Sequence, residues 1–144
     1  MAWWSRVPLR VSAVPAPGRP LALWDLNHDA VCTLANALGA EHGVAAVGLQ
    51  VDVADPAAIH AAANSTREAI GGIGGLVHAA GMVLQMPVAD TAVEAWDRLL
   101  NVNLRALLLS VQALLPDLEQ SDHGAVVGIG SINATLGNGL IPAY

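Results

Sequence analysis

The sequence predicts an α/β fold built on a parallel sheet. Over residues 21–131, short apolar runs of strand length alternate with longer stretches in which apolar residues recur at helical spacing. One helical stretch separates each apolar run from the next, which is typical of parallel strands joined by right-handed crossovers. The chain has 144 residues, 54% of them hydrophobic, so it is long and apolar enough to bury a core.

The first strand and helix follow the Pro-rich start of the chain. Residues 21–24 are apolar on both faces and end at Asp25, as expected for a buried parallel strand. Asn27 can cap the helix that follows, because its side-chain oxygen can accept a hydrogen bond from an N–H of the first turn. A second strand is predicted over residues 44–51.

The second helix begins at Asp55, where a cap residue stands directly before a proline that suits the first helical position. It is predicted to end near residue 70 at a pair of glycines, and a third strand follows over residues 76–79. Thr91 and Glu94 have the spacing of a capping box, which predicts the start of a third helix.

This third helix is predicted to be long and to continue to Leu118, with kinks expected near Asn101 and near Pro116. A fourth strand is predicted over residues 125–130, an apolar run that ends in glycine. The whole alternation therefore predicts four parallel strands and their connecting helices.

Residues 1–20 do not continue this alternation, because four prolines exclude a helix through the segment. Residues 9–14 alternate between apolar and other side chains, so a short strand could form there. We therefore predict an irregular Pro-rich segment over residues 1–20 and a single domain over residues 21–144.

The composition argues against several classes of function. With a net charge of −6, the six Lys and Arg residues form no basic patch, so no nucleic-acid partner is expected. The most apolar run contains Asn, Arg, Ser and Gln side chains, so no membrane span is expected. The histidines lack ligand spacing, so no metal site is expected. Cys32 is the single cysteine, which excludes a disulfide within the chain, and a cytoplasmic location is expected.

Small and polar residues recur at the ends of the predicted strands and in the long helix. They are Asp25, the pair Asp52-Val53, the turn Ala79-Ala80-Gly81, Asn103, Ser131 and Tyr144. Together these residues resemble the motifs of the short-chain dehydrogenase/reductase family, which consists of single-domain Rossmann enzymes that use a nicotinamide cofactor. The resemblance implies that residues 21–144 form a partial Rossmann domain with a doubly wound parallel sheet. Residues 133–139 also resemble a loop of 3-oxoacyl-thioester and related sugar or polyol reductases.

The resemblance implies NAD as the cofactor. In the family, a carboxylate in the place of Asp25 accepts hydrogen bonds from the adenosine ribose, and it would repel a 2′-phosphate. Asp52 and Val53 would contact the adenine, and the Ala79-Ala80-Gly81 turn would face the cofactor, with Ala79 where the family has Asn. Considered alone, Asp25 and Asp52 are residues that commonly begin turns.

The resemblance also implies the catalytic residues. Tyr144 would give its phenolic proton to the substrate carbonyl oxygen, and the Ser131 hydroxyl would hydrogen-bond the same oxygen. Asn103 would hold a water in the proton path, although a polar residue on a packed helix is the alternative interpretation. His78, in an apolar strand, is interpreted as a core histidine.

Two parts of the family pattern are not recognisable in the sequence. No Gly-rich phosphate loop precedes residue 21, and the family's catalytic Lys and substrate-covering region would lie beyond Tyr144. The predicted strands correspond to strands 2 to 5 of a sheet ordered 3-2-1-4-5, so a slot one strand wide is expected in its middle. Three outcomes are open: residues 9–14 fill the slot, the sheet closes up, or a partner chain supplies a strand.

Three hypotheses on function follow, and the sequence leaves open whether this chain is itself an enzyme. The first is a fragment of an NAD(H)-dependent oxidoreductase that interconverts a ketone and a secondary alcohol on a small molecule. The second is a catalytically inactive, truncated subunit that packs on a full-length relative. The third is a degenerate product without a stable function. Because the long helix resembles the family's dimer helix, a homo-oligomer or a complex with a relative is expected.

Overall fold

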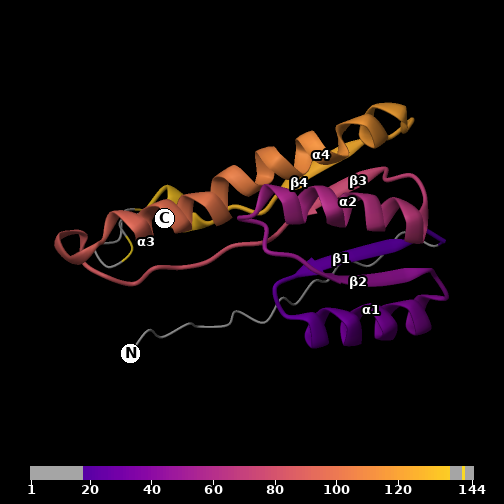
Figure 1. Ribbon diagram of the computed structural model, residues 1–144, viewed down its shortest axis with the longest axis horizontal. Coiled ribbons are helices and arrows are strands. Elements are labelled where there is room, and N and C mark those ends of the chain that lie inside the picture. Colours follow the sequence, from indigo (N-terminus) through magenta and orange to yellow (C-terminus); the bar gives the residue numbers. More distant parts are fainter. Residues whose placement is uncertain (1–17, 137–140, 142–144) are drawn as a thin grey trace.

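The computed structural model describes residues 18–136 and residue 141. The order of its elements, shown in Figure 1, is β1 (Leu21–Asp25), α1 (His28–His42), β2 (Ala46–Gln50), α2 (Pro56–Ile70), β3 (Gly75–His78), η1 (Val88–Asp90), α3 (Val93–Leu100), η2 (Asn101–Arg105), α4 (Ala106–Gln120), β4 (Ala125–Gly128) and η3 (Ile132–Ala134). This alternation confirms the predicted α/β class, with strand and helix bounds close to those expected.

The four strands form two separate parallel pairs. β1 pairs with β2, with Leu21 opposite Ala46 and Asp25 opposite Gln50. β3 pairs with β4, with Gly75 opposite Ala125. Among the described residues β1 and β3 do not pair, so the sheet has not closed up across the expected slot.

Capping side chains explain where the first two helices begin. The Asn27 side chain accepts a hydrogen bond from the Ala30 N–H at 3.1 Å, which satisfies one of the unpaired amides of α1. Asp55 accepts a hydrogen bond from the Ala57 N–H at 2.9 Å at the start of α2. α1 ends at Gly43, which has a φ of 64°, a conformation that glycine adopts without strain.

α1 and the α2–α4 pair pack on opposite faces of the first sheet. Leu23 packs with Val31 and Ala35 of α1, whereas Trp24, the next residue along β1, packs against a cluster contributed by α2 and α4. Trp24 also donates a hydrogen bond from its Nε1 to Thr66 Oγ1 of α2 at 3.0 Å. Because side chains alternate across a strand, both faces of β1 are therefore covered.

α2 and α4 are joined by an ion pair as well as by apolar contact. The Arg67 guanidinium donates from Nε and from one terminal nitrogen to the same Asp117 carboxylate oxygen, at 2.8 and 2.7 Å. It also donates to the Ala113 carbonyl at 2.7 Å. Ile59 lies fully buried in the apolar cluster beside this pair. These contacts fix the two helices as one layer.

The long third helix differs from the prediction in two places. Its capping box does not form: Ala92 is the N-cap residue, and the Thr91 hydroxyl donates instead to the Pro87 carbonyl at 3.0 Å, which closes the turn of η1. The irregularity expected near Asn101 is a π-helical turn, η2, between α3 and α4. Pro116 lies within α4, and the helix continues to Gln120.

The second sheet is much less covered than the first. All four residues of β4 are exposed, and so is Val77 on β3. Leu76 packs against the α2–α4 cluster, so only one face of this sheet meets helices in the described part of the chain. The predicted boundary between residues 1–20 and the domain stays a prediction, because residues 1–17 lie outside the described residues.

Candidate functional site

The first group of predicted site residues lies at the carboxyl ends of β1 and β2. The Asp25 carboxylate accepts a hydrogen bond from the Asn27 N–H at 2.8 Å, and the Asp25 carbonyl accepts one from Val51 at 2.9 Å. Asp52 follows β2 and accepts a hydrogen bond from the Ala54 N–H at 2.9 Å. Both carboxylates are half-buried and oriented by their own turns, and Val53 beside them is also half-buried.

The second group surrounds the turn after β3. Asn103 holds this turn with both ends of its side-chain amide: Oδ1 accepts from the Met82 N–H at 2.8 Å, and Nδ2 donates to the Met82 carbonyl at 2.9 Å. A Cβ atom on Gly81 would lie 3.6 Å from Asn103 Oδ1, so the turn and the helix are in contact there. Asn103 therefore fixes the backbone directly after Ala79-Ala80-Gly81.

The π-helical turn places Asn103 and also frees a backbone carbonyl. The Ala106 N–H bonds to the Asn101 carbonyl five residues back, where an α-helix would use the Val102 carbonyl. A backbone hydrogen bond at Val102 raises the pKa of His78, but burial has the larger effect and lowers the pKa below its usual range. The sequence indicated a core histidine, and His78 is indeed buried.

His78 is a feature of the site that the sequence only partly revealed. Its Nε2 atom is buried and has no hydrogen-bond partner among the described residues. A buried polar atom without a partner costs free energy, so a neutral ring is favoured there. The sequence signal for a buried histidine was the single His within an apolar strand. The backbone hydrogen bond between His78 and Val102 could not be predicted, because it depends on the π-helical turn.

Ser131 follows β4 at the same sheet end as the Ala79-Ala80-Gly81 turn. The Ile129 N–H donates to the His78 carbonyl at 2.9 Å, which continues the β3–β4 pairing to that end. The Ser131 hydroxyl oxygen accepts a hydrogen bond from the Asn133 N–H at 3.2 Å and so caps η3. Its side chain is half-buried.

The structure therefore assembles two groups at the carboxyl ends of two parallel pairs. One contains the carboxylates of Asp25 and Asp52, and the other contains the turn after β3, Asn103 and Ser131. Tyr144 lies outside the described residues, so its predicted role stays a prediction. In the described ranges no group of three or more His, Cys, Asp or Glu side chains could hold a metal ion.

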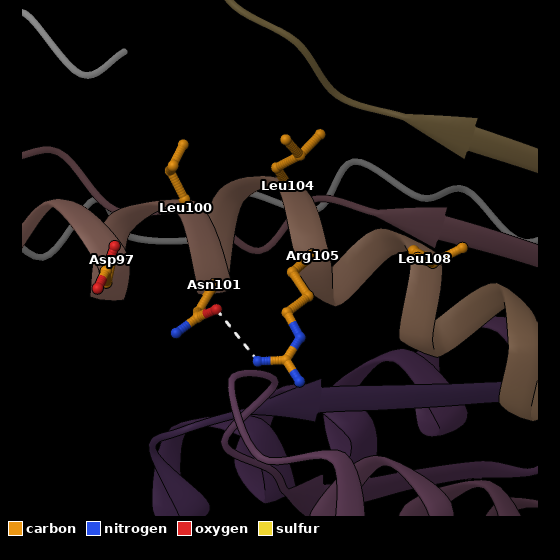
Figure 2. Close-up of a pocket in the computed structure, with 6 residues that line it drawn as sticks. All are labelled: Asp97, Leu100, Asn101, Leu104, Arg105 and Leu108. Carbon is orange, nitrogen blue, oxygen red and sulfur yellow. Dashed lines mark hydrogen bonds between the residues drawn. The ribbon is translucent and has the colours of Figure 1, made fainter.

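A surface hollow lies elsewhere, on the outer side of the long helix. Figure 2 shows its lining residues, and Arg105 donates there to the Asn101 side-chain oxygen at 3.3 Å. The lining consists of Asp97, Leu100, Asn101, Leu104, Arg105 and Leu108. None of these is among the predicted site residues, although Asn101, Leu104 and Arg105 share the π-helical turn with Asn103.

Parallel strands with polar groups at their carboxyl ends define the class of doubly wound, nucleotide-binding α/β proteins. The sequence model described as short chain dehydrogenase matches residues 12–144. The chain belongs to this family, and the prediction made from its motifs is confirmed.

Similar proteins of known name agree with this assignment. A 2-dehydro-3-deoxy-L-rhamnonate dehydrogenase (NAD(+)) of a Sphingomonas species is 32% identical over 130 residues, which are 90% of this chain and 50% of that protein. An inactive 2-(S)-hydroxypropyl-CoM dehydrogenase 2 of Xanthobacter autotrophicus is 37% identical over 119 residues, or 83% of this chain and 51% of that protein. The chain thus spans about half the length of the curated relatives it matches.

A solved structure matches the fold closely. The L-sorbose reductase of Gluconobacter frateurii, in complex with NADPH and L-sorbose, superposes with a TM-score of 0.82 at 26% identity. The match covers 87% of this chain and 48% of the reductase. The described strands and helices are therefore a partial Rossmann fold, as the sequence predicted.

Proposed function

We propose that this chain is part of an NAD(H)-dependent oxidoreductase that interconverts a ketone and a secondary alcohol on a small molecule. The observation that carries the proposal is the grouping of Asn103, Ser131 and the Ala79-Ala80-Gly81 turn at one sheet end. Asn103 holds the Met82 backbone through two hydrogen bonds, and Ser131 follows the adjacent strand. In open α/β sheets, ligands bind outside the carboxyl ends of the strands, which is where these residues lie.

NAD rather than NADP is the proposed cofactor. Asp25 ends a strand with its carboxylate half-buried, and one oxygen already accepts the Asn27 N–H. The other oxygen can accept from ribose hydroxyls, whereas a 2′-phosphate would meet a like charge. Asp52 and Val53 would contact the adenine. The names of the relatives include both an NAD(+) enzyme and a complex with NADPH, so the preference rests on Asp25.

The residues of the second group divide the remaining tasks. A nicotinamide ring, when bound, supplies or accepts the hydride. Ser131 offers a hydroxyl that can donate to a substrate carbonyl oxygen while its own oxygen accepts from Asn133. Asn103 fixes the turn and so keeps its backbone in place beside the cofactor. Tyr144 would be the proton donor.

A second candidate function is a catalytically inactive subunit that packs on a full-length relative or on another copy. One observation favours it: the outer face of the long helix exposes a row of large apolar side chains. They are Val93, Trp96, Leu104, Leu108 and Leu115. Figure 2 shows Asp97, Asn101 and Arg105 on this helix, with Asp97 and Arg105 each four residues from Asn101. If the helices of two copies packed antiparallel and crossed at Asn101, Asp97 of each copy would therefore lie near Arg105 of the other, and the two charges would attract.

A cytoplasmic location, without membrane insertion, belongs to the same proposal. By length and composition alone, the helical stretch Val93–Gln120 could cross a membrane. A core helix of a soluble protein passes the same test, and here Leu114 and Leu118 pack into the cluster beside α2. We therefore assign this stretch to packing within the protein and between subunits.

Calorimetric titration with NAD⁺ and NADP⁺ tests the cofactor proposal. NAD⁺ should bind the purified chain more tightly than NADP⁺, and Asp25→Asn should weaken NAD⁺ binding about tenfold, the loss expected for one charge-assisted hydrogen bond. Asp29→Asn is the matched control, because it removes the same charge from a fully exposed carboxylate on α1. Equal binding of both cofactors by wild type and Asp25→Asn would contradict the proposal.

Turnover separates the two candidate functions. The absorbance of NADH, followed with a set of small ketones and ketoses, should fall for an active oxidoreductase and fall more slowly for Ser131→Ala. Cofactor binding without turnover, together with a concentration-dependent dimer, would favour the inactive subunit. If the chain neither binds a cofactor nor turns over a substrate, the oxidoreductase proposal is contradicted.

A further inference from the structure

The turn that carries Asp25 is held from the neighbouring strand β2 as well as by its own residues. The Asp25 carbonyl accepts a hydrogen bond from the Val51 N–H at 2.9 Å. One residue further on, the Leu26 carbonyl accepts a hydrogen bond from Gln50 Nε2 at 3.1 Å. Gln50 is the last residue of β2, and none of the motifs in the sequence includes it. Its side chain therefore reaches a turn that belongs to the candidate cofactor site.

The parallel register of β1 and β2 explains why Gln50 lies beside this turn. Gln50 stands opposite Asp25, two residues after the pair of Leu23 and Gly48. Because registered neighbours direct their side chains to the same face, and residues two apart share a face, Gln50 lies on the face of Leu23. That face is covered by α1, since Leu23 packs against Val31 of this helix. The Gln50 amide is thus on the side of the sheet where α1 begins.

Gly48 allows α1 to lie close enough to β2 for this contact. A Cβ atom at position 48 would lie 2.6 Å from the Val31 carbonyl oxygen and 2.8 Å from the Cys32 backbone nitrogen, closer than a real Cβ approaches such atoms. Glycine therefore lets the backbone of α1 lie directly on β2. The turn that leads into α1 is consequently held beside the end of β2, within the length of a glutamine side chain.

Gln50 and Asp25 bind the two ends of one peptide group. The carbonyl of Leu26 and the N–H of Asn27 belong to the same planar, trans peptide bond, so they point in opposite directions. Gln50 donates to this carbonyl, and the Asp25 carboxylate accepts from this N–H at 2.8 Å. The bonds form one chain in which each polarises the next. The orientation of this peptide plane therefore determines how the Asp25 carboxylate is held.

We propose that Gln50 is a positioning residue that sets the preference of the site for an adenosine ribose without a 2′-phosphate. The inference rests on the proposed binding of the ribose by Asp25. By holding the Leu26 carbonyl, Gln50 keeps the Asn27 N–H directed at one carboxylate oxygen of Asp25. The other oxygen then has a fixed direction in which it can accept from ribose hydroxyls. Gln50 acts on the cofactor through Asp25 and not by direct contact.

The state of the turn without this bond explains the link to specificity. When position 50 offers no donor, the peptide between Leu26 and Asn27 can rotate and take the Asn27 N–H away from Asp25. Ribose binding must then order the carboxylate, which weakens the binding. A 2′-phosphate gains little from an ordered carboxylate, because it meets a like charge in every orientation. Loss of the Gln50 donor should therefore weaken NAD⁺ binding more than NADP⁺ binding.

The exposure of Gln50 separates this role from one in overall stability. Both Gln50 and Leu26 are exposed, so water can satisfy either polar group and the fold does not depend on the bond between them. Substitutions at exposed positions usually change the free energy of unfolding little. A variant at position 50 should therefore fold like the wild type.

Calorimetric titration of Gln50→Met tests the proposal, because methionine matches glutamine in length but cannot donate a hydrogen bond. NAD⁺ binding should weaken about fivefold, as expected for the loss of one neutral hydrogen bond, and NADP⁺ binding by no more than about twofold. Gln120→Met is the matched control. Gln120 is exposed at the end of α4, away from Asp25, so this variant should leave both affinities unchanged.

A double-mutant cycle tests whether Gln50 acts through Asp25. In the Asp25→Ala background the carboxylate that Gln50 orients is gone, so Gln50→Met should weaken NAD⁺ binding no further. An effect as large as in the wild-type background would mean that Gln50 contacts the cofactor directly, and it would overturn the proposal.

Hydrogen exchange measured by NMR tests the turn without any cofactor. The Asn27 amide should exchange about fivefold faster in Gln50→Met than in the wild type, because its bond to Asp25 is less often formed. The Ala57 amide, which Asp55 binds in a similar way at 2.9 Å at the start of α2, should exchange equally in both proteins. Unchanged exchange of the Asn27 amide would overturn the proposal.

The two measurements also separate a failure of this inference from a failure of the proposed function. If the wild type binds neither cofactor, the proposed function is wrong, and the role of Gln50 in cofactor preference is wrong with it, even where the Asn27 amide exchanges as expected. If the wild type prefers NAD⁺ but Gln50→Met weakens both cofactors equally, only the role of Gln50 is wrong.

Discussion

The two sheets of this protein use the same parallel pairing but differ in how far helices cover them. β1 is covered by α1 on one face and by α2 and α4 on the other, through Leu23 and Trp24 respectively. In the second sheet only Leu76 of β3 packs against the cluster, whereas all four residues of β4 are exposed, Val127 to 48%. Strand pairing alone therefore does not decide burial. The stability of each sheet depends on the chain segments that supply its covering helices.

The largest difference between the regions should appear in their cores. Ile59→Ala removes a fully buried side chain from the cluster that joins both sheets, and it should lower the free energy of unfolding by about 3 kcal/mol. Val127→Ala, in the less covered β3–β4 sheet, should lower the free energy of unfolding by no more than about 0.5 kcal/mol. Urea unfolding followed by circular dichroism measures both. Similar losses for the two variants would remove the distinction between the sheets.

A second prediction concerns the layer that α2 and α4 form together. Arg67→Ala leaves the Asp117 carboxylate, which is 12% exposed, without its charged partner, and it also removes the bond to the Ala113 carbonyl. The expected loss is about 2 kcal/mol, as for hydrogen bonds to a charged group. Arg98→Ala, an exposed arginine on α3, is the matched control and should have little effect. Equal losses would mean that the ion pair contributes nothing specific.

The third prediction concerns the contact between Asn103 and the turn that follows β3. Asn103→Ala removes both hydrogen bonds to Met82 and should cost about 1 kcal/mol. The Met82 amide should also exchange faster than in the wild type. Asn101→Ala removes only a bond to Arg105 and should leave that amide unchanged. If Met82 exchange does not change in Asn103→Ala, the turn is held by other contacts.

The smallest effect concerns pH. Because burial lowers the pKa of His78 in the folded state, the unfolded state takes up its proton first as pH falls. Stability from this group is therefore complete above an unfolded pKa of about 6.5 and decreases as pH falls from there to the folded pKa. His78→Gln should reduce the slope of urea midpoint against pH in that window, whereas His60→Gln, at an exposed position, should not. An unchanged slope in His78→Gln would contradict the account.

The sequence predicted the elements whose causes are local. The turn from Asp25 to Asn27, the cap at Asp55 and the apolar strands need only neighbours along the chain, and all are found. The family motif at Asn103 was also identified from sequence, although its two bonds to the Met82 backbone were not.

The remaining differences arise from contacts distant in sequence or from competing partners. Thr91 has the spacing of a cap, but its hydroxyl bonds to Pro87, which leaves Ala92 at the helix start. The π-helical turn Asn101–Arg105 lies where the helix meets Met82 and His78, neither of which is on that helix. A pattern read along one helix cannot contain such partners.

The most direct test of the whole account is hydrogen exchange of the purified chain with and without saturating NAD⁺. We expect bound NAD⁺ to slow the exchange of the amides around Asp25 and Asp52, at the ends of β1 and β2, and of those around the turn after β3. NADP⁺ at the same concentration should protect the turn at Asp25 less, because of the like charge. Protection confined to the outer face of the long helix, or none with either cofactor, would contradict the assignment of the strand ends as the cofactor site.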